Sequence, residues 1–188
     1  SATKYLGGHS DVIAGALVVK DAALGEQLHF QQFATGGTLG PMDSYLVLRG
    51  IKTLHLRMQR HCENGEKVVD FLKNHPKIGT VFFLFFPEHP FHEIAKKQMS
   101  GFGGMVSFNF KSGAKADAIS FLEKLKVFTL AESLGGVESL ANHPALMTHA
   151  SIPEDKRKEI GITDDLVRLS VVIEDADDLI EDLKQALA

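Results

Sequence analysis

The sequence has a single cysteine, Cys62, and no tryptophan among its 188 residues. One thiol cannot form a disulfide within the chain, and such cysteine usage is typical of a reducing compartment, so we expect a cytoplasmic location. Long apolar runs are also missing, because stretches such as residues 81–87 are far shorter than the roughly 20 residues that a membrane-spanning helix needs. We therefore expect neither a membrane span nor a disulfide-stabilised fold.

A surplus of positive charge is absent as well. The chain carries 20 Lys and Arg against 24 Asp and Glu, a formal charge of −4, and no polybasic run. This balance disfavours nucleic acid and anionic membranes as partners and favours a small molecule or another protein. The apolar content of 44% is ordinary for a globular domain with a core of its own.

The first residues place Lys4 between two hydroxyl side chains and a pair of glycines. Ser1 and Thr3 lie two positions apart, so in an extended segment both hydroxyls point to one side and can donate to a phosphate that the lysine faces. Gly7 and Gly8 allow a tight turn behind them. A lysine held in this way can attack an aldehyde. The same residues also fit a solvated loop or a module that only binds a phosphate-bearing ligand.

Apolar periodicity predicts an α/β fold in which strands and helices alternate. Residues 12–19 predict a strand buried on both faces, and a helix follows from residue 21 to about 35. Residues 42–74 predict a long helix, bent or divided, with Arg57 on its solvent face. Further strands are expected at 80–86, 105–110, 127–130 and 167–173, and further helices at 91–99, 114–125 and 176–187.

Arg168 alternates with apolar residues in the strand expected at 167–173. Val167, Leu169 and Val171 share one face, which places Arg168 and Ser170 on the other. A guanidinium on a rigid strand can bind a carboxylate through two parallel hydrogen bonds, a usual way to orient an amino acid. The pattern also fits an edge-strand arginine in a surface ion pair.

Three other arrangements are interpreted as structural. His89 and His92 have the spacing of metal ligands, but Pro90 prevents a regular helix through them and no cysteines complete a site, so no metal is expected. Cys62 is interpreted as a half-buried thiol within a helix. Residues 9–11 read His-Ser-Asp, but they lack the flanking glycines of a nucleophile elbow.

Residues 1–11 resemble the cofactor-lysine signature of the pyridoxal-phosphate (PLP) enzymes of cysteine and methionine metabolism. Further motifs similar to that family follow in the expected order and span nearly the whole chain. They are Gly40-Pro41-Met42-Asp43-Ser44, Leu48-Arg49-Gly50-Ile51-Lys52-Thr53-Leu54, Ala131-Glu132-Ser133-Leu134-Gly135-Gly136, Met147-Thr148-His149 and Leu166-Val167-Arg168-Leu169-Ser170-Val171. Within the family, the sequence is most similar to the branch of cystathionine gamma-lyases and gamma-synthases.

The resemblance implies a fold and partners. In the family the cofactor lysine lies near the middle of a longer chain, so this sequence resembles the C-terminal half of an aspartate-aminotransferase-like (type I) PLP enzyme of the α/β class. Residues 1–50 would end the large parallel-sheet domain that binds PLP, 51–75 would form a connecting helix, and 76–188 a smaller α/β domain on the substrate side. Implied partners are the missing N-terminal half and further copies, in a homotetramer built as a dimer of dimers.

The resemblance also implies the cofactor site. Lys4 would hold PLP covalently and then act as a general base, while Ser1 and Thr3 would bind the phosphate. On the substrate side, Arg168 and Ser133 would hold the α-carboxylate.

Glu132 would face the distal end of the substrate, where an acid favours the far amino group of cystathionine. The implied activity is γ-elimination on cystathionine-type sulfur amino acids, giving cysteine, 2-oxobutyrate and ammonia. The alternatives are the γ-synthase reaction, in which cysteine replaces the leaving group of an O-acylhomoserine, and an inactive half-chain that acts only in assembly.

Two places depart from the family pattern. Val172 follows Ser170-Val171 where the family usually has glycine, and a β-branched residue would be strained there if φ were positive, with displacement of Arg168 as the expected result. Residues 81–86 are all apolar where family members resemble Tyr-Tyr-Pro-Gly-Leu. We expect either that a partner covers this segment or that it promotes aggregation.

Overall fold

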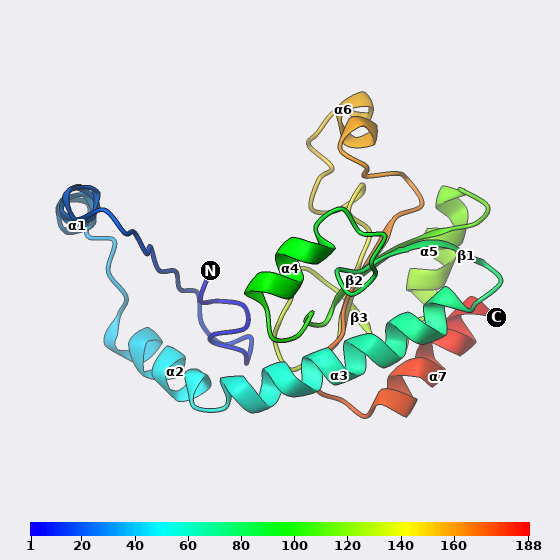
Figure 1. The fold of residues 1–188 in the computed structure, drawn as a ribbon, viewed down its shortest axis with the longest axis horizontal. Coiled ribbons are helices and arrows are strands. Elements are labelled where there is room, and N and C mark those ends of the chain that lie inside the picture. The colour runs from blue at the N-terminus through cyan, green and yellow to red at the C-terminus, as the bar shows by residue number, and fades with distance from the viewer. The chain divides into compact units, whose positions relative to one another are not determined.

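The computed structural model describes all residues, 1–188, and divides into two compact units, Ser1–Leu54 and His55–Ala188. Figure 1 traces the chain through both units and labels all seven helices and the strands β1, β2 and β3. We call them the first and the second unit and describe each by itself. No helix in either unit combines the length with the apolar content that a bilayer span requires.

The first unit contains two helices, α1 (Ala22–Thr35) and α2 (Pro41–Ile51). The Asp21 side chain accepts the Leu24 N–H at 2.6 Å and caps the start of α1. Gly36, with φ of 70°, ends the helix in the left-handed conformation that glycine adopts without strain. The helix predicted from residue 21 to about 35 is confirmed.

The strand predicted at residues 12–19 is wrong, because the structure has no regular secondary structure there. Only Val12 and Ala14 are buried, whereas Ile13, Leu17 and Val18 are exposed, Val18 to 93%. A strand exists only when a neighbour accepts and donates its backbone hydrogen bonds. Nothing in this chain pairs with the segment as a strand, so its apolar side chains remain uncovered here.

The longest helix of the second unit is α3 (Leu54–Lys73). The helical stretch predicted at 42–74 is therefore divided into α2 and α3, and the break follows Ile51. Arg57 was predicted on the solvent face, and this is wrong, since only 5% of it is exposed. Its position explains the burial: Arg57 precedes His61 and Asn64 by four and seven residues, so the three lie on one face of the helix. That face is turned inward, and all three side chains are buried.

Five strands form one sheet in the order β1-β2-β5-β4-β3. Neighbouring strands run antiparallel except β3 and β4, which are parallel. The strands are β1 (Ile78–Phe82), β2 (Met105–Phe110), β3 (Thr129–Leu130), β4 (Leu140–Asn142) and β5 (Val167–Ser170). The central strand β5 therefore has a hydrogen-bonded neighbour on both sides.

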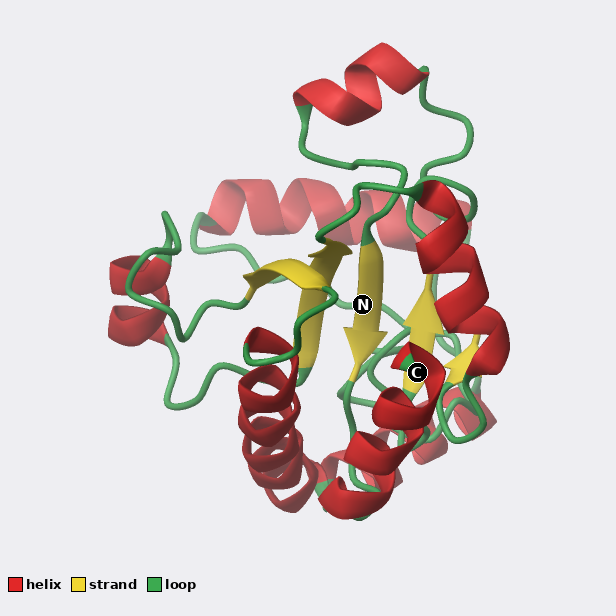
Figure 2. Ribbon diagram, turned by 90° about the vertical axis from the view of Figure 1, so that its right-hand side faces the viewer, coloured by secondary structure: helices red, strands yellow, loops and turns green.

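Three helices, α3, α5 (Lys115–Lys124) and α7 (Ala176–Leu187), cover one face of this sheet (Figure 2). They form the core with the strand residues that point to that face. Its fully buried members include Val68, Leu72, Val106, Phe108, Ala118, Ala141, Val167, Leu169, Leu179 and Leu183. The predicted α/β fold class is confirmed, and the strands and helices expected from residue 76 onward are present with shifted ends.

The structure contains two elements between residues 130 and 167, where neither a strand nor a helix was predicted. They are β4 and the short helix α6 (Glu154–Glu159). Another difference is β1, which ends at Phe82 instead of reaching residue 86. The chain turns there because Phe83 enters the core, while α4 (His92–Gln98) begins only after a series of turns. Phe82 and Phe85 stay exposed, so cover by a partner remains a prediction for this segment.

Contrary to the expectation from the sequence, Val172 does not disturb the fold. Its φ is not positive, and the side chain is fully buried. Its N–H donates to Ser139 Oγ at 3.1 Å, and its carbonyl accepts from Asn64 Nδ2 at 2.7 Å. The prediction of strain at this position is therefore wrong, because a valine fits the backbone conformation and fills space in the core.

Candidate functional site

Lys4 lies in a turn that the backbone holds from several sides. The Ala2 and Thr3 N–H groups donate to the Ala14 carbonyl at 2.8 and 3.1 Å, and Gly8 N–H donates to the Lys4 carbonyl at 2.8 Å. The Thr3 hydroxyl donates to the Ala14 carbonyl at 3.2 Å and accepts the Ala14 N–H at 2.9 Å. The lysine is thus presented from a fixed backbone rather than from a loose end.

Helix α2 packs directly on this turn. Gly50 is buried in the last turn of α2, and a Cβ added to it would overlap the Gly7 carbonyl oxygen. Only glycine permits so close an approach of two backbones. A small apolar cluster lies beside the contact and consists of Ala2, Val12, Ala14, Leu46 and Val47.

The residues around Lys4 fit a phosphate-bearing aldehyde in their donor chemistry. An amine and two hydroxyls occur within four residues, Ser1 is exposed, and Lys4 is half-buried. The Thr3 hydroxyl is engaged by Ala14, so a phosphate contact would require it to exchange the Ala14 carbonyl for a phosphate oxygen. Roles for Ser1, Thr3 and Lys4 in binding PLP remain predictions.

Arg168 lies in the central strand β5, on the face opposite the helices. Val167 and Leu169 point into the core, so the predicted alternation is present. Arg168 is half-buried, and within the chain its side chain forms no hydrogen bond and no ion pair. An unpaired guanidinium on a rigid strand is well placed to receive a carboxylate.

Sequence reasoning missed Asn142, which lies opposite Arg168 in the pairing of β4 with β5. Residues opposite each other in an antiparallel pair project from the same face, so the two side chains are neighbours. Asn142 is only 1% exposed, and its Oδ1 and Nδ2 have no hydrogen-bond partner. The sequence offered no periodic signal for it, because β4 has just three residues, Leu140-Ala141-Asn142.

The loop of Glu132 and Ser133 lies against the same strand. Both residues are exposed, and Ser133 has a φ of 69°, which is uncommon for a residue other than glycine. Two residues later, the Gly135 N–H donates to Ser170 Oγ at 3.1 Å. The structure therefore brings this loop to the strand that carries Arg168, whereas Lys4 belongs to the first unit.

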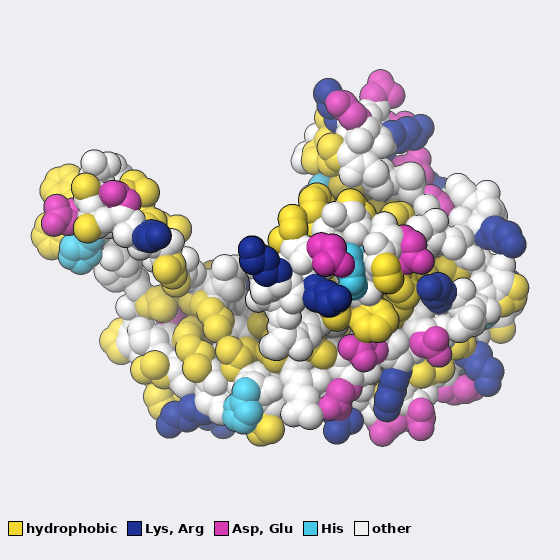
Figure 3. Space-filling view, viewed as in Figure 1, with side chains coloured by type: hydrophobic (Ala, Val, Ile, Leu, Met, Phe, Trp, Pro, Cys, Tyr) yellow, Lys and Arg dark blue, Asp and Glu magenta, His cyan; other side chains and the backbone are white.

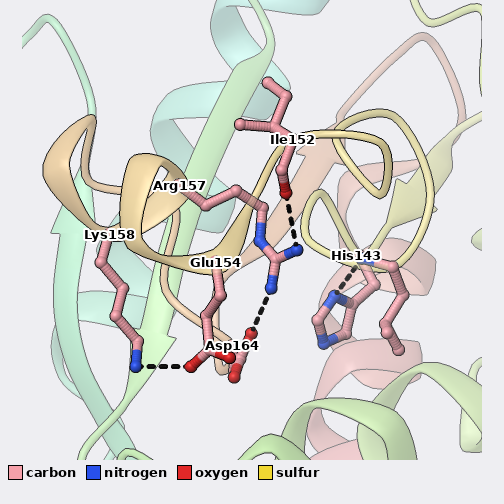
Figure 4. A network of polar contacts seen from close by, with 7 residues as sticks. His143, Ile152, Glu154, Arg157, Lys158 and Asp164 are labelled. Carbon is pink, nitrogen blue, oxygen red and sulfur yellow. Dashed lines mark hydrogen bonds and ion pairs between the residues drawn. The ribbon is translucent and has the colours of Figure 1, made fainter.

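A polar network holds the segment that contains α6 (Figure 4). Arg157 donates to the Ile152 carbonyl at 3.2 Å and to Asp164 Oδ1 at 3.1 Å. His143, which follows Asn142 directly, is buried, and this burial lowers its pKa. Lys158 and Glu154 add an exposed ion pair at 2.6 Å. These contacts fix the excursion between β4 and β5, and the structure gives them no role beyond that.

The remaining candidates do not form a site. No three side chains of the His, Cys, Asp and Glu types converge in a way that could hold a metal ion. Cys62 is half-buried, and its Sγ accepts the Gly103 N–H at 3.3 Å.

Comparisons with known proteins agree with these observations. A family model described as "Cys/Met metabolism PLP-dependent enzyme" matches residues 1–188. A cystathionine gamma-lyase of Bacillus subtilis is 58% identical over 187 residues, and a cystathionine beta-lyase of Coxiella burnetii is 54% identical over 188 residues. These alignments cover 100% of this chain but 49% and 48% of the two relatives.

A solved structure of a cystathionine gamma-synthase, from Xanthomonas oryzae pv. oryzae, has a TM-score of 0.94 and 46% identity. The match covers 100% of this chain and 48% of the synthase. The chain thus spans about half the length of the relatives that it matches. Their fold confirms the predicted half of a PLP enzyme, and the chain belongs to the family of PLP-dependent enzymes of cysteine and methionine metabolism.

Proposed function

We propose that the chain works as the C-terminal half of an enzyme that carries out γ-elimination on cystathionine-type sulfur amino acids and releases cysteine, 2-oxobutyrate and ammonia. The observation that supports this proposal best is the unpaired guanidinium of Arg168 on β5. A half-buried cation without a partner is costly to keep unless a ligand supplies the opposite charge. An amino-acid substrate brings such a charge in its α-carboxylate.

Lys4 is the proposed residue for the chemical steps. Bound PLP withdraws electrons from the α-carbon of an attached amino acid and so makes its C–H group acidic. Lys4 Nζ would hold the cofactor and, once the substrate amine has displaced it, accept the proton from the α-carbon. The same nitrogen would then take a proton from the β-carbon, and the electron pair left there would break the bond between the γ-carbon and the sulfur and expel cysteine. Ser1 and Thr3 would bind the phosphate and so fix the cofactor beside this amine.

On the substrate side, Arg168 would bind the α-carboxylate through paired hydrogen bonds, and Ser133 would add a further contact. Glu132 is exposed on the same loop and is proposed to attract the distal ammonium group of cystathionine. These roles follow from the family resemblance and from the position of the 132–136 loop against β5.

The proposal includes a second half of the protein and further copies of it. Figure 3 shows apolar side chains gathered over α1, and no residue of that helix is buried within this chain. Exposed apolar surface of this extent is typical of an interface. We propose that residues 1–50 complete the cofactor-binding domain, that 51–75 connect it to the substrate-side domain at 76–188, and that the enzyme assembles as a tetramer.

Product analysis separates the reactions after which the relatives are named. The full-length protein is incubated with PLP and cystathionine, and 2-oxobutyrate, pyruvate, cysteine and homocysteine are measured. We expect 2-oxobutyrate and cysteine. Pyruvate with homocysteine would instead show elimination at the β-carbon, and formation of cystathionine from cysteine and an O-acylhomoserine without lyase products would show the synthase reaction. Either of these results would contradict the proposal.

The second candidate is an inactive half-chain that acts only in assembly, a role that the uncovered apolar side chains of α1 would serve. The 188-residue chain and the full-length protein are mixed with PLP, and their visible absorbance is recorded before and after borohydride. Under our proposal, the full-length protein shows a reducible absorbance that Lys4→Ala removes, while Lys77→Ala keeps it. A full-length protein without such absorbance would support the assembly role instead.

A further inference from the structure

Ser133 has a backbone conformation that is uncommon for a residue other than glycine. Apart from Ser10, it is the only residue other than glycine with a positive φ. Such a conformation costs on the order of 1–3 kcal/mol and persists only where the surroundings enforce it. Ser133 itself is exposed, and two sets of hydrogen bonds hold the residues that follow it.

The first of these contacts joins the loop to the strand of Arg168. The Gly135 N–H donates to Ser170 Oγ at 3.1 Å, and Ser170 is fully buried. Ser170 follows Arg168 by two residues, so both side chains project from the same face of β5. One rigid strand therefore carries the guanidinium and also the hydroxyl that fixes the Ser133 loop.

A second contact closes the other end of the loop. Glu174 accepts the Ser139 N–H at 2.5 Å and the Ser139 hydroxyl at 2.9 Å, while Ser139 Oγ accepts the Val172 N–H at 3.1 Å. Asn64 Nδ2 donates to the Glu174 carbonyl at 2.8 Å and ties this region to α3. The loop is thus held at Gly135 and at Ser139 by Ser170, Val172 and Glu174, which lie two, four and six positions after Arg168.

We propose that Ser170 is a positioning residue that sets Ser133 at a fixed place relative to Arg168, so that one α-carboxylate meets both, and that Glu174 supports it from the far end of the loop. This inference rests on the proposed function, since it assumes that Arg168 and Ser133 receive the substrate carboxylate. Ser170 touches the loop backbone and not the substrate. Its removal should therefore weaken recognition of the carboxylate without removing the chemistry.

The test compares two ligands that differ in the carboxylate, L-serine and ethanolamine. Binding of each to the full-length protein with PLP is measured from the change in visible absorbance, and the ratio of the two dissociation constants reports selectivity for the carboxylate. We expect Ser170→Ala to reduce this ratio about tenfold, the equivalent of one well-placed hydrogen bond. The KM for cystathionine should rise by a similar factor, with kcat changed by less than about threefold.

Three further variants keep the result interpretable. Ser170→Thr retains the hydroxyl and should restore most of the ratio. Ser112→Ala removes a hydroxyl that accepts the Ala114 N–H before α5 and should leave the ratio unchanged. Glu174→Gln keeps the shape of the side chain but loses one acceptor oxygen. It should reduce the ratio of the dissociation constants about threefold. This variant tests the proposal even if Ser170→Ala does not fold.

The outcomes separate the inference from the proposed function. If the unaltered protein prefers L-serine and folded Ser170→Ala or Glu174→Gln variants keep that preference in full, the positioning role is overturned. If the unaltered protein binds L-serine and ethanolamine equally, the carboxylate site itself is overturned and the proposed function fails with it.

Discussion

The two units differ in how completely they bury their apolar side chains. The second unit has a continuous core between its sheet and helices α3, α5 and α7. The first unit buries only Ala2, Val12 and Ala14 in its cluster, and α1 buries no residue at all. The unit that carries Arg168 can therefore stabilise itself, whereas the unit that carries Lys4 needs a further surface to cover it.

Matched phenylalanine substitutions should show most clearly that the two units differ in how much buried apolar side chains stabilise them. Phe108→Ala removes a fully buried ring from the second unit and should lower the free energy of unfolding by about 3–5 kcal/mol. Phe33→Ala removes a ring that is 78% exposed in the first unit and should change it by less than about 0.5 kcal/mol. Urea unfolding of the 188-residue chain measures both. Equal losses would mean that α1 is packed within the chain after all.

A glycine substitution tests the one tight contact of the first unit. Gly50→Ala places a Cβ on the Gly7 carbonyl oxygen, so α2 must move away from the Lys4 turn. Amide exchange at Gly8, whose N–H donates to the Lys4 carbonyl, should become about tenfold faster, equivalent to about 1.4 kcal/mol. Hydrogen-exchange mass spectrometry or NMR provides the rate.

The control for this change is Gly15→Ala, because a Cβ at Gly15 meets nothing within 4 Å. It should leave the exchange rate at Gly8 as it was. Unaltered exchange in Gly50→Ala would show that the turn does not depend on α2.

The smallest expected effect is the pH dependence of the free energy of unfolding that comes from a buried histidine in the second unit. Burial lowers the pKa of His61, although its hydrogen bond to the Val171 carbonyl opposes the shift. The unfolded chain therefore binds a proton near the ordinary histidine pKa of about 6.5 while the folded chain stays neutral. Stability should fall as pH drops below about 6.5, by at most about 1.4 kcal/mol per pH unit for this one proton.

Denaturant unfolding between about pH 7.5 and pH 5.5 measures this dependence, a range that brackets the ordinary histidine pKa. His61→Gln should flatten it, and His55→Gln, an exposed position on the same helix, should not. A pH dependence that persists in full in His61→Gln would assign the proton to another group, with His143 as the next candidate, because burial lowers its pKa as well.

Elements with complete local signals could be predicted from the sequence. Helix α7 has Asp175 as its N-cap and an apolar face that includes Leu179 and Leu183, so cap and periodicity agree. In β5 the alternation correctly placed Arg168 opposite the core. The motif at Lys4 indicated the family, although the sequence could not show that the Thr3 hydroxyl bonds to Ala14.

Features that depend on distant residues could not be predicted. Residues 12–19 have the composition of a strand but no neighbour to pair with, and composition does not report on neighbours. Arg57 was misplaced because a helix pattern shows which residues share a face, not what that face meets. The bond from Gly135 to Ser170 joins residues 35 positions apart, and no local pattern encodes it.

The place of β5 in the sheet has a consequence for partly unfolded forms of the protein. With a paired strand on each side, the amide hydrogens of Val167–Ser170 should exchange only when the whole second unit opens. Local opening elsewhere, including fraying of α6 or of the two-residue strand β3, would leave this strand intact. Arg168 thus belongs to the strand that is expected to unfold last in the second unit.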